Sequence, residues 1–373
     1  MPDKDKGVVP MKTTVRRVLI LGVLLAVCLV GCLSSGVAAS GTQTDAYMSN
    51  ILSLKHTLRF NEQGKFKIVV FSDIQDRYPM KADTLAYMNK ILDAEKPDLV
   101  LLGGDNHSGT MDSESVFRKY LNDMSKPMES RKIPWAQVYG NHVTGGYGFT
   151  MSGPSKVRQQ QIYEEMPYNL SKAGTVFGVG NYVLPILCSN SDKVGFNVFM
   201  MDSHTYLKDW RSDLEAKAIL PRMTFQGGEY NPIHFDQIKW YWDTSVAMEA
   251  YNGSKVPAMM LFHIPLQEYC YITNNPKETW KTGTNEDGPG ASSLNSGLFH
   301  ACFERGDVKG IFSGHQHRNT ITGKYMDITL GYTPTIGSYE YYSEGTRGAR
   351  VVEIDQKDAF NFTTRIVYCK DLK

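Results

Sequence analysis

The stretch KIVVFSDIQ, residues 67–75, joins an uninterrupted apolar run to a carboxylate and an amide. An apolar run of this length, rich in β-branched residues, indicates a strand whose two faces are both covered. The stretch DLVLLGGD, residues 98–105, repeats the pattern and again ends in a carboxylate. Between them, residues 83–95 place apolar side chains on one helical face, with Asp83 as the expected N-cap and Pro97 beyond the end. We therefore predict a strand–helix–strand unit of a layered α/β core.

The alternation of strands and helices continues toward the end of the chain. Strands over residues 351–354 and 363–367 are expected to help close a second sheet. The chain shows no internal repeat and no second domain boundary, so its body is predicted to be one α/β domain. The other predicted strands are 135–139, 195–201, 257–262 and 308–312, and the other predicted helices are 113–124, 233–251 and 294–305.

Three segments carry more specific expectations. Residues 144–185 are rich in glycine, glutamine and tyrosine without a regular period, which predicts a long insertion. Residues 273–292 are polar and rich in turn formers, which indicates a surface loop or lid. The helix over 233–251 is expected to bury one apolar face. That face carries Phe235, Ile238, Trp242 and Val246.

Composition excludes several classes of protein. The 373 residues are 42% hydrophobic and 21% charged, an ordinary globular composition that rules out collagen-like, coiled-coil and largely disordered chains. The formal net charge is +1, and the basic excess lies in residues 1–31. The remainder is close to neutral, without the electrostatic footprint of a nucleic-acid-binding protein. We therefore expect no nucleic-acid partner.

The N-terminus has the pattern of an export signal. A basic pair, Arg16 and Arg17, precedes an apolar run at residues 18–30 that is short for a transmembrane helix. The tetrapeptide LVGC at residues 29–32 resembles the bacterial lipobox, in which the cysteine is lipidated and becomes the first mature residue. We predict an export signal over 1–32 ending at Cys32, a tether over 33–50, and a single domain over 51–373.

The alternative to a lipid anchor is ordinary secretion. The segment VAA at residues 37–39 resembles an A-x-A cleavage site before Ser40. The protein is thus expected to be exported, either as a membrane-anchored lipoprotein or as a free secreted or periplasmic protein. The remaining mature cysteines form no C-x-x-C pair, which argues against a zinc ribbon, and their three possible disulfide pairings stay open. They are Cys188, Cys270, Cys302 and Cys369.

Polar side chains of metal-binding type follow five of the predicted strands. A residue of this kind at one strand end has a simple structural explanation as a helix cap, a turn residue or a core histidine. Their joint occurrence at the carboxyl ends of strands, where α/β folds place active sites, favours a metal site. The five sets are Asp73 with Gln75, Asp105, Asn141 with His142, His263, and His315 with His317.

In this order the motifs D-x-Q, G-D, G-N-H, H and G-H-x-H resemble those of the calcineurin-like metallophosphoesterases. The resemblance spans about residues 66–355, nearly the whole mature chain. Within this family, the sequence most resembles the purple-acid-phosphatase-like branch of yeast and plant phosphatases. The shared strings are GDN at 104–106, FHIPL at 262–266, GDVK at 306–309 and GARV at 348–351. The resemblance implies a four-layer αββα β-sandwich with metal ligands at the carboxyl ends of strands.

The resemblance also implies a site for two divalent metal ions bridged by Asp105. Mixed nitrogen and oxygen ligands suit Mn, Fe or Zn. Such a pair activates water as a metal-bound hydroxide, which would attack a phosphate monoester. One ion would be held by Asp73, Gln75, Asp105 and His317. The other would be held by Asp105, Asn141, His263 and His315.

The same comparison assigns His142 to catalysis, as general acid or transition-state stabiliser for the leaving group. Asn106, His107 and His142 are the expected substrate contacts, with an exposed loop position as the alternative for His107. Two positions depart from the family pattern. Gln75 stands where many members have histidine, and Val143 stands where a carboxylate commonly orients the catalytic histidine, a role for which Asp202 or His204 could substitute.

Taken together, the sequence predicts an exported dinuclear-metal phosphoesterase acting on monoesters. The expected substrate is a phosphate ester, either a small molecule or a phosphoprotein. If the lipid anchor is used, the membrane is a second expected partner. The alternatives are a phosphodiesterase of the same fold and a weakly active, surface-anchored binding protein. The oligomeric state stays open.

Overall fold

The computed structural model describes residues 45–109, 111–143, 153–210, 229–274 and 281–372. The chain divides into two compact units, Met1–Asn50 and Ile51–Lys373. In the first unit the described residues, 45–50, are helical. The predicted export signal and Cys32 lie outside the described residues and stay predictions. Among the described helices, none has the length and apolar character that crossing a membrane requires.

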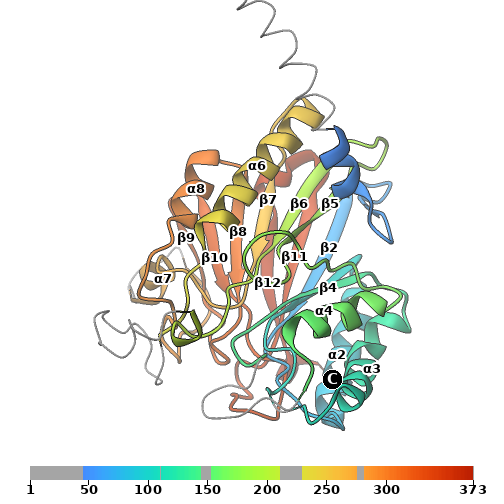
Figure 1. The fold of residues 1–373 in the computed structure, drawn as a ribbon, viewed down its shortest axis with the longest axis vertical. Helices are drawn as coiled ribbons and strands as arrows, with labels where there is room; N and C mark the ends of the chain where they lie inside the picture. The colour runs from blue at the N-terminus through green and yellow to red at the C-terminus, as the bar shows by residue number, and fades with distance from the viewer. Residues whose placement is uncertain (1–44, 110, 144–152, 211–228, 275–280, 373) are drawn as a thin grey trace, which may run out of the picture. The chain divides into compact units, whose positions relative to one another are not determined.

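Two sheets form the centre of the second unit (Figure 1). The seven-stranded sheet has the order β1-β5-β6-β7-β8-β10-β9, and the five-stranded sheet has the order β12-β11-β2-β3-β4. The strands of the first are β1 (Leu58–Arg59), β5 (Tyr182–Leu187), β6 (Val194–Met200), β7 (Ala258–Leu261), β8 (Val308–Ser313), β9 (Thr322–Tyr325) and β10 (Ile328–Tyr332). Those of the second are β2 (Lys65–Phe71), β3 (Leu99–Gly103), β4 (Trp135–Val138), β11 (Gly348–Asp355) and β12 (Thr363–Tyr368).

Helices cover the outer face of each sheet, as Figure 1 shows. On the five-stranded sheet, Val69 and Val100 share a buried cluster with residues of α2, α3 and α4. The alternate side chains Ile68 and Val70 pack in a different cluster with β6 and β7 residues of the other sheet. The predicted four-layer αββα fold is therefore confirmed. The helices are α2 (Ala82–Glu95), α3 (Glu114–Glu129), α4 (Lys156–Glu165), α6 (Phe235–Asn252), α7 (Tyr269–Asn274) and α8 (Leu298–Arg305).

Parallel pairing brings the carboxyl ends of the strands that precede the ligand candidates to one edge of each sheet. β2, β3 and β4 pair in parallel, and so do β6, β7 and β8. The C-terminal tail adds antiparallel strands to both sheets: β11 pairs with β2, whereas β9 pairs with β10 at the edge of the other. The strands predicted over 351–354 and 363–367 lie within β11 and β12, which extend the five-stranded sheet of β2 and do not close the other sheet as predicted.

The lack of a regular period over 144–185 does not mean a lack of regular structure in its described part. This region contains α4 and the strand β5. The helix has no apolar stripe because its buried face includes Gln159 and Gln160, whose amides bond to other protein groups. Buried polar groups with internal partners are tolerated, but they leave no hydrophobic period in the sequence.

The predicted buried face of α6 is also wrong. Phe235 is 79% exposed and Val246 is 46% exposed. The opposite face is buried, and its hydroxyl groups are satisfied: those of Tyr241 and Ser245 both donate to the carboxylate of Asp307. The helix thus packs through a polar network, which the apolar pattern could not reveal.

Asp83 does not cap α2 as predicted. The N-cap position belongs to Lys81, and Asp83 lies in the first turn. Its carboxylate accepts hydrogen bonds from Ser338 and from Arg347, at 2.8 Å each. Two partners distant in the sequence therefore determine its orientation.

The observed orientation of α6 can be tested with a pair of substitutions. Met248→Ala removes a fully buried side chain and should lower the free energy of unfolding by about 2–5 kcal/mol. Phe235→Ala removes a larger but exposed side chain and should change it by about 0.5 kcal/mol or less. Urea denaturation of both variants measures the difference. A larger loss for Phe235→Ala would favour the face predicted from the sequence.

Candidate metal centre

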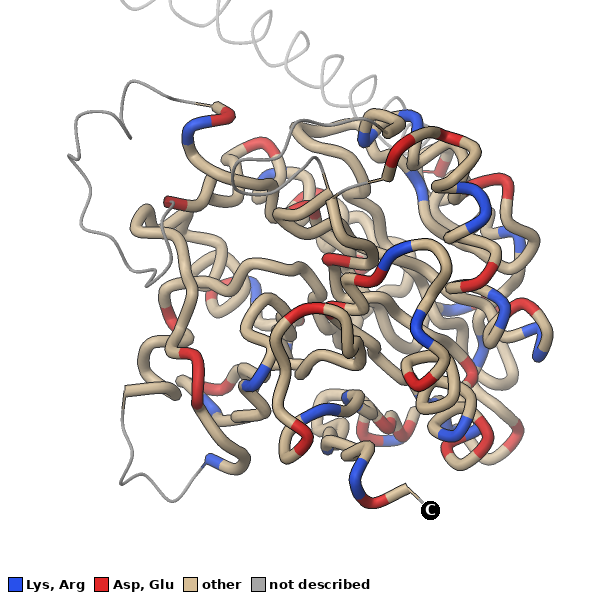
Figure 2. The backbone as a smooth tube through the Cα atoms, turned by 90° about the horizontal axis from the view of Figure 1, so that it is seen from below, with Lys and Arg blue, Asp and Glu red and all other residues tan. Residues whose placement is uncertain are grey.

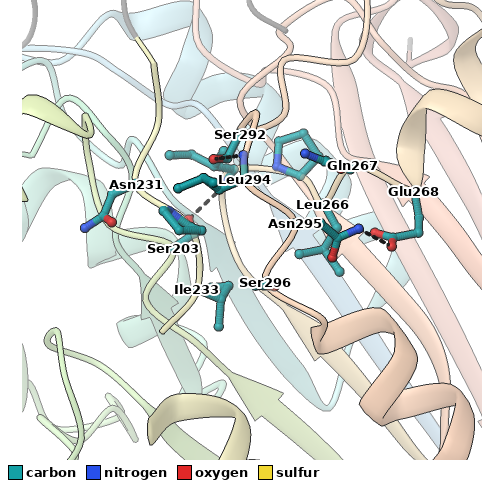
Figure 3. A pocket seen from close by; sticks show the side chains of 13 residues that line it. Ser203, Asn231, Ile233, Leu266, Gln267, Glu268, Ser292, Leu294, Asn295 and Ser296 are labelled. Atoms are coloured by element: carbon teal, nitrogen blue, oxygen red, sulfur yellow. Dashed lines mark hydrogen bonds between the residues drawn. The ribbon is translucent and has the colours of Figure 1, made fainter. Parts of the chain in front are cut away.

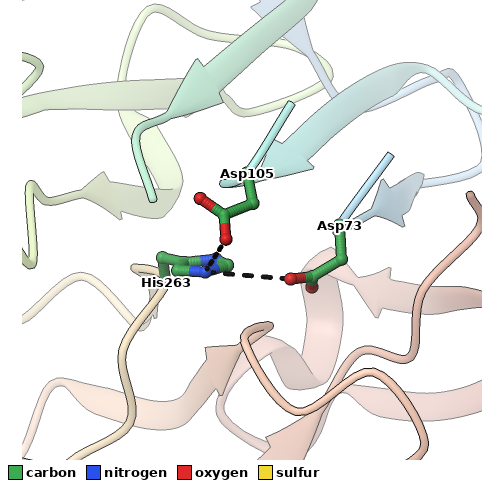
Figure 4. Close-up of side chains that lie close together, drawn as sticks. All are labelled: Asp73, Asp105 and His263. Atoms are coloured by element: carbon green, nitrogen blue, oxygen red, sulfur yellow. Dashed lines mark ion pairs between the residues drawn. The ribbon is translucent and has the colours of Figure 1, made fainter. Parts of the chain in front are cut away.

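Asp73, Asp105 and His263 form a buried cluster where the two sheets meet (Figure 4). The His263 Nε2 atom lies 3.1 Å from Asp105 Oδ2 and 3.7 Å from Asp73 Oδ1. His317 joins them, with its Nε2 atom 3.4 Å from Asp73 Oδ1. The two carboxylates follow β2 and β3, whereas the two histidines follow β7 and β8. Neighbouring side chains from both sheets therefore point into one site.

Unusual backbone conformations turn the ligand candidates inward. Asp73 and Asp105 have φ angles of 48° and 46°, in the left-handed region that aspartate adopts more readily than most residues. Glycine beside them permits a close approach: a Cβ at Gly140 would lie 2.0 Å from Asp105 Oδ1, and one at Gly314 would lie within 2.6 Å of Asp73 Oδ2. Conformational strain and close packing of this kind gather at functional sites.

Each carboxylate is held through one oxygen and leaves the other for the site. Asp73 Oδ2 accepts hydrogen bonds from Ser72 Oγ at 2.6 Å and from the backbone N–H of His315 at 3.0 Å. Asp105 Oδ1 accepts from the backbone N–H of His142 at 2.9 Å. The free atoms, Asp73 Oδ1 and Asp105 Oδ2, are those that lie near the histidines.

Backbone carbonyl groups orient the two histidines. The Nδ1 atom of His263 lies 2.8 Å from the carbonyl oxygen of Gly103, and that of His317 lies 2.7 Å from the carbonyl oxygen of Tyr341. Burial opposes the charged form of His263, but the charges of Asp105 and Asp73 raise its pKa to about 9. Once a cation replaces the Nε2 proton, Nδ1 donating to a carbonyl leaves the Nε2 lone pair for the metal, which is the usual arrangement of a metal ligand. The Tyr341 ring also stacks on His317, with centroids 4.1 Å apart.

The amide candidates present unpartnered oxygens. Asn141 Nδ2 donates to Tyr206 Oη at 3.1 Å, which leaves its Oδ1 for the site. Among the described residues, Oδ1 of Asn141, Oε1 of Gln75 and Oδ1 of Asp73 are buried without a hydrogen-bond partner. Buried acceptors without partners are costly, so their occurrence together among predicted ligands fits a site that cations complete. Neither Tyr206 nor Tyr341 was predicted from the sequence as a residue that orients a ligand.

The electrostatics of the site reflect close packing of charges in a dry environment. Burial raises the pKa of Asp73, and the neighbouring histidines oppose this only in part. Burial also acts on Asp105, but the charges of His263 and His142 outweigh it and hold the pKa well below its ordinary value. Burial lowers the pKa of His315, which favours the neutral ring that can bind a metal.

His315 completes the set of predicted ligands on the His263 side. Its ring lies edge-on to that of His263, with centroids 5.2 Å apart, and edge-on to Tyr230 at 4.7 Å. The structure therefore places Asp73, Asp105, His263, His315 and His317 next to one another. The ligand assignment to two separate ions stays a prediction.

The three predicted substrate contacts differ in accessibility. The His142 side chain is 34% exposed, and its Nε2 atom lies 3.9 Å from Asp105 Oδ2, so it faces the centre. Asn106 is buried and donates to the carbonyl oxygen of Val138. His107 is buried as well, with its ring nitrogens 3.0 Å from Gln159 Oε1 and 2.8 Å from its neighbour's carbonyl oxygen. The placement of His107 favours a structural role. Asn106 keeps a buried Oδ1 without a partner among the described residues, so its substrate contact stays a prediction, and His142 keeps the position of a substrate contact.

No carboxylate among the described residues takes the place left by Val143. Val143 itself is buried in the core beneath the helices. Asp202, a predicted substitute, pairs with Lys156 and accepts from the backbone N–H of Val179 at 2.8 Å. His204 bonds through Nε2 to Gln237 Oε1 at 2.7 Å. Both predicted substitutes are therefore engaged in a different network.

A small pocket lies beside the centre, next to the loop that follows β6 (Figure 3). Ser203 lines it, and its Oγ accepts hydrogen bonds from the backbone N–H groups of His263 and Ile264. Amides, hydroxyls and apolar groups form the rest of its described wall, together with Glu268, which bonds to Asn295 at 2.9 Å. No lysine, arginine or histidine is among the described lining residues.

Comparisons with known proteins identify similar sequences and folds. A family model described as calcineurin-like phosphoesterase matches residues 66–319. The chain is 27% identical to "Probable inactive purple acid phosphatase 14" of Arabidopsis thaliana, across 92% of this chain and 86% of that protein. It is 31% identical to "Phosphatase DCR2" of Saccharomyces cerevisiae, across 70% of this chain and 46% of that protein. A solved dimetal phosphatase from Danio rerio superimposes with a TM-score of 0.46 at 12% identity, covering 77% of this chain and 95% of that one.

The tight contact at Gly140 predicts the effect of a single methyl group. In Gly140→Ala the new Cβ would displace Asp105, so the purified protein should bind markedly less metal while keeping its secondary structure. Gly345→Ala is the control, because the nearest atom to its Cβ is Ser343 Oγ at 3.5 Å. Elemental analysis and circular dichroism measure the two effects. Full metal content in Gly140→Ala would show that Asp105 is not a ligand.

Proposed function

This chain belongs to the calcineurin-like phosphoesterase family, and we propose that it is a dinuclear-metal enzyme that hydrolyses phosphate monoesters. The observation that carries the proposal is the convergence of unpartnered buried acceptors with the Nε2 atoms of His263 and His317. A chain that had lost the chemistry would have little reason to keep such a costly arrangement. The set of predicted ligands is complete in this sequence.

Two divalent ions fit the residues present. Asp73, Gln75, Asp105 and His317 would hold one ion, and Asp105, Asn141, His263 and His315 would hold the other. When bound, such ions polarise the phosphoryl oxygens and lower the pKa of water, which supplies a nucleophile near neutral pH. The nitrogen and oxygen donors are compatible with Mn, Fe or Zn.

The protein's own contribution to bond cleavage would come from His142. The backbone N–H of His142 is fixed to Asp105, so its ring is held at the mouth of the site. The Nε2 atom faces the centre, and a proton on it can pass to the departing oxygen of the ester. A neutral alcohol then leaves, and His142 recovers its proton from solvent through its exposed side.

Val143 stands where family members commonly have a carboxylate, and this difference motivates a second candidate function: a weakly active protein that binds phosphate esters. No described carboxylate takes the place left by Val143 to orient His142. The word "inactive" in the name of the plant relative belongs to that protein. The complete set of ligand candidates in this chain supports the enzyme over the binding protein.

We further propose that the protein is exported through its N-terminal segment. The support is the basic pair, the apolar run and Cys32 in the sequence. Along the described backbone, the positions of lysine and arginine are interspersed with those of aspartate and glutamate, as Figure 2 shows from below. A mixed charge distribution of this kind favours a small or protein-borne phosphate ester as substrate.

Two aryl substrates test the proposed function. With added Mn or Zn, the protein should hydrolyse 4-nitrophenyl phosphate faster than bis(4-nitrophenyl) phosphate, and a chelator should abolish the reaction. Preference for the diester would identify a phosphodiesterase of the same fold. Binding of metal and phosphate without turnover of either ester would establish the binding protein instead.

The role of His142 predicts a substrate-dependent loss. His142→Ala should lower the rate by about 10²–10⁴ on an alkyl phosphate, because the departing alkoxide needs a proton. The loss should be much smaller on 4-nitrophenyl phosphate, whose phenolate leaves unaided. Metal content should not change, since His142 is assigned no metal. Equal losses on both substrates would contradict the acid role and leave the metal site intact.

A further inference from the structure

Arg77 lies two residues after the ligand candidate Gln75, where two loops that carry ligand candidates run side by side. The backbone N–H of Gln75 donates to the carbonyl oxygen of Asp105, and that of Ser108 donates to the carbonyl oxygen of Asp76, both at 2.9 Å. These bonds join the segment after β2 to the segment after β3. Arg77 is the next residue outward along the first of them.

The guanidinium group of Arg77 is held in two places. Its Nε donates to Ser108 Oγ at 3.1 Å, and its carbon lies 4.6 Å from the ring centre of Tyr339. The loop of Tyr339 is itself fixed against the end of β2, because Thr335 Oγ1 donates to the carbonyl oxygen of Asp73 at 2.6 Å. A side chain constrained in this way loses less entropy when it binds a ligand.

The terminal nitrogens of Arg77 remain available. Within the part of the chain that the structure describes, neither Nη atom has a protein partner and no carboxylate pairs with the group. Two other arginines near the site are neutralised: Arg318 pairs with Asp287 at 2.7 Å, and Arg347 pairs with Asp83 at 2.8 Å. Arg77 therefore presents an uncompensated planar fork of hydrogen-bond donors.

Lys81 brings a second positive charge to the same ring. Its Nζ lies 5.8 Å from the centre of the Tyr339 ring, and its charge partly offsets the rise that burial causes in the pKa of the nearby Asp76. The adjacent carboxylate of Asp76 is engaged by the backbone N–H groups of Arg77 and Lys81, at 2.8 Å each. Two cations over one ring repel each other unless an anion lies between them. The pocket in Figure 3 offers no cation, so the segment of Arg77 and Lys81 is the anion-attracting side of the site.

We propose that Arg77, assisted by Lys81, binds a second anionic group of the substrate beside the phosphate that is hydrolysed. The inference rests on the proposed function and names its substrate class: phosphate esters that carry another phosphate or a carboxylate a few atoms away. The guanidinium fork matches either group through two parallel hydrogen bonds. The ligand candidates bind the scissile phosphate, and Arg77 selects what is attached to it.

A pair of substrates that differ in one phosphate tests the proposal. Wild type should show a higher kcat/KM on propane-1,3-diyl bisphosphate than on 3-hydroxypropyl phosphate. Arg77→Ala should lower kcat/KM about tenfold or more on the bisphosphate, the effect of losing charge-assisted hydrogen bonds, with little change on the monophosphate. Arg77→Lys should restore part of the preference, since it keeps the charge without the fork.

Lys119→Ala is the matched control. It removes an exposed positive charge that lies over Tyr78, outside the Tyr339 arrangement, and should leave the preference unchanged. Equal losses on both substrates in Arg77→Ala, or none, would overturn the proposal. A loss of preference in Lys119→Ala as large as in Arg77→Ala would overturn it too, because general surface charge would then explain the effect.

Calorimetric binding separates this inference from the proposed function. The metal-loaded wild type should bind propane-1,3-bisphosphonate more tightly than propylphosphonate, and Arg77→Ala should lose the difference. That result without any hydrolysis would support the anion site while rejecting the phosphatase. No difference in wild type, or an unchanged difference in Arg77→Ala, would reject the anion site whether or not the protein is a phosphatase.

Discussion

The rest of the structure depends on the interaction of His263 with two buried carboxylates, Asp73 and Asp105. His263 Nε2 lies within 4 Å of both Asp73 and Asp105, although it comes from the other sheet. Burying two like charges is costly unless donors or cations offset them. The backbone N–H groups of His142 and His315 offset part of the cost. Divalent ions would offset the rest, so the site ties the ends of both sheets together.

The surroundings of the centre leave little freedom for its side chains. Gly104 and Gly140 provide room that no Cβ could share, because His263 and Asp105 occupy it. Tyr206 turns the amide of Asn141 so that its oxygen faces the site. Preorganisation of this kind keeps the donors in place before any substrate arrives. It also explains why the rim, rather than the centre, is where substrate selection can vary.

The sequence predicted elements well where apolar burial alone builds them. The runs before Asp73 and Asp105 are strands covered on both faces, and their composition shows it. It failed where polar groups fill the core. The buried face of α6 satisfies its hydroxyls through Asp307, and α4 buries glutamines, so neither helix carries the expected apolar stripe. Because the prediction considered only hydrophobicity, it assigned the exposed Phe235 to the buried face of α6.

The sequence by itself determined the donor set, its order along the chain and its placement at strand ends, because a strand and the residue after it are covalent neighbours. Tertiary structure alone decided which atoms face the centre. His263 is oriented by a carbonyl group 160 residues away, and His317 by one 24 residues away. It also buried His107, and it holds the guanidinium of Arg77 against Ser108 and Tyr339. These side-chain orientations depend on contacts between segments distant in the sequence, so the local sequence pattern cannot predict them.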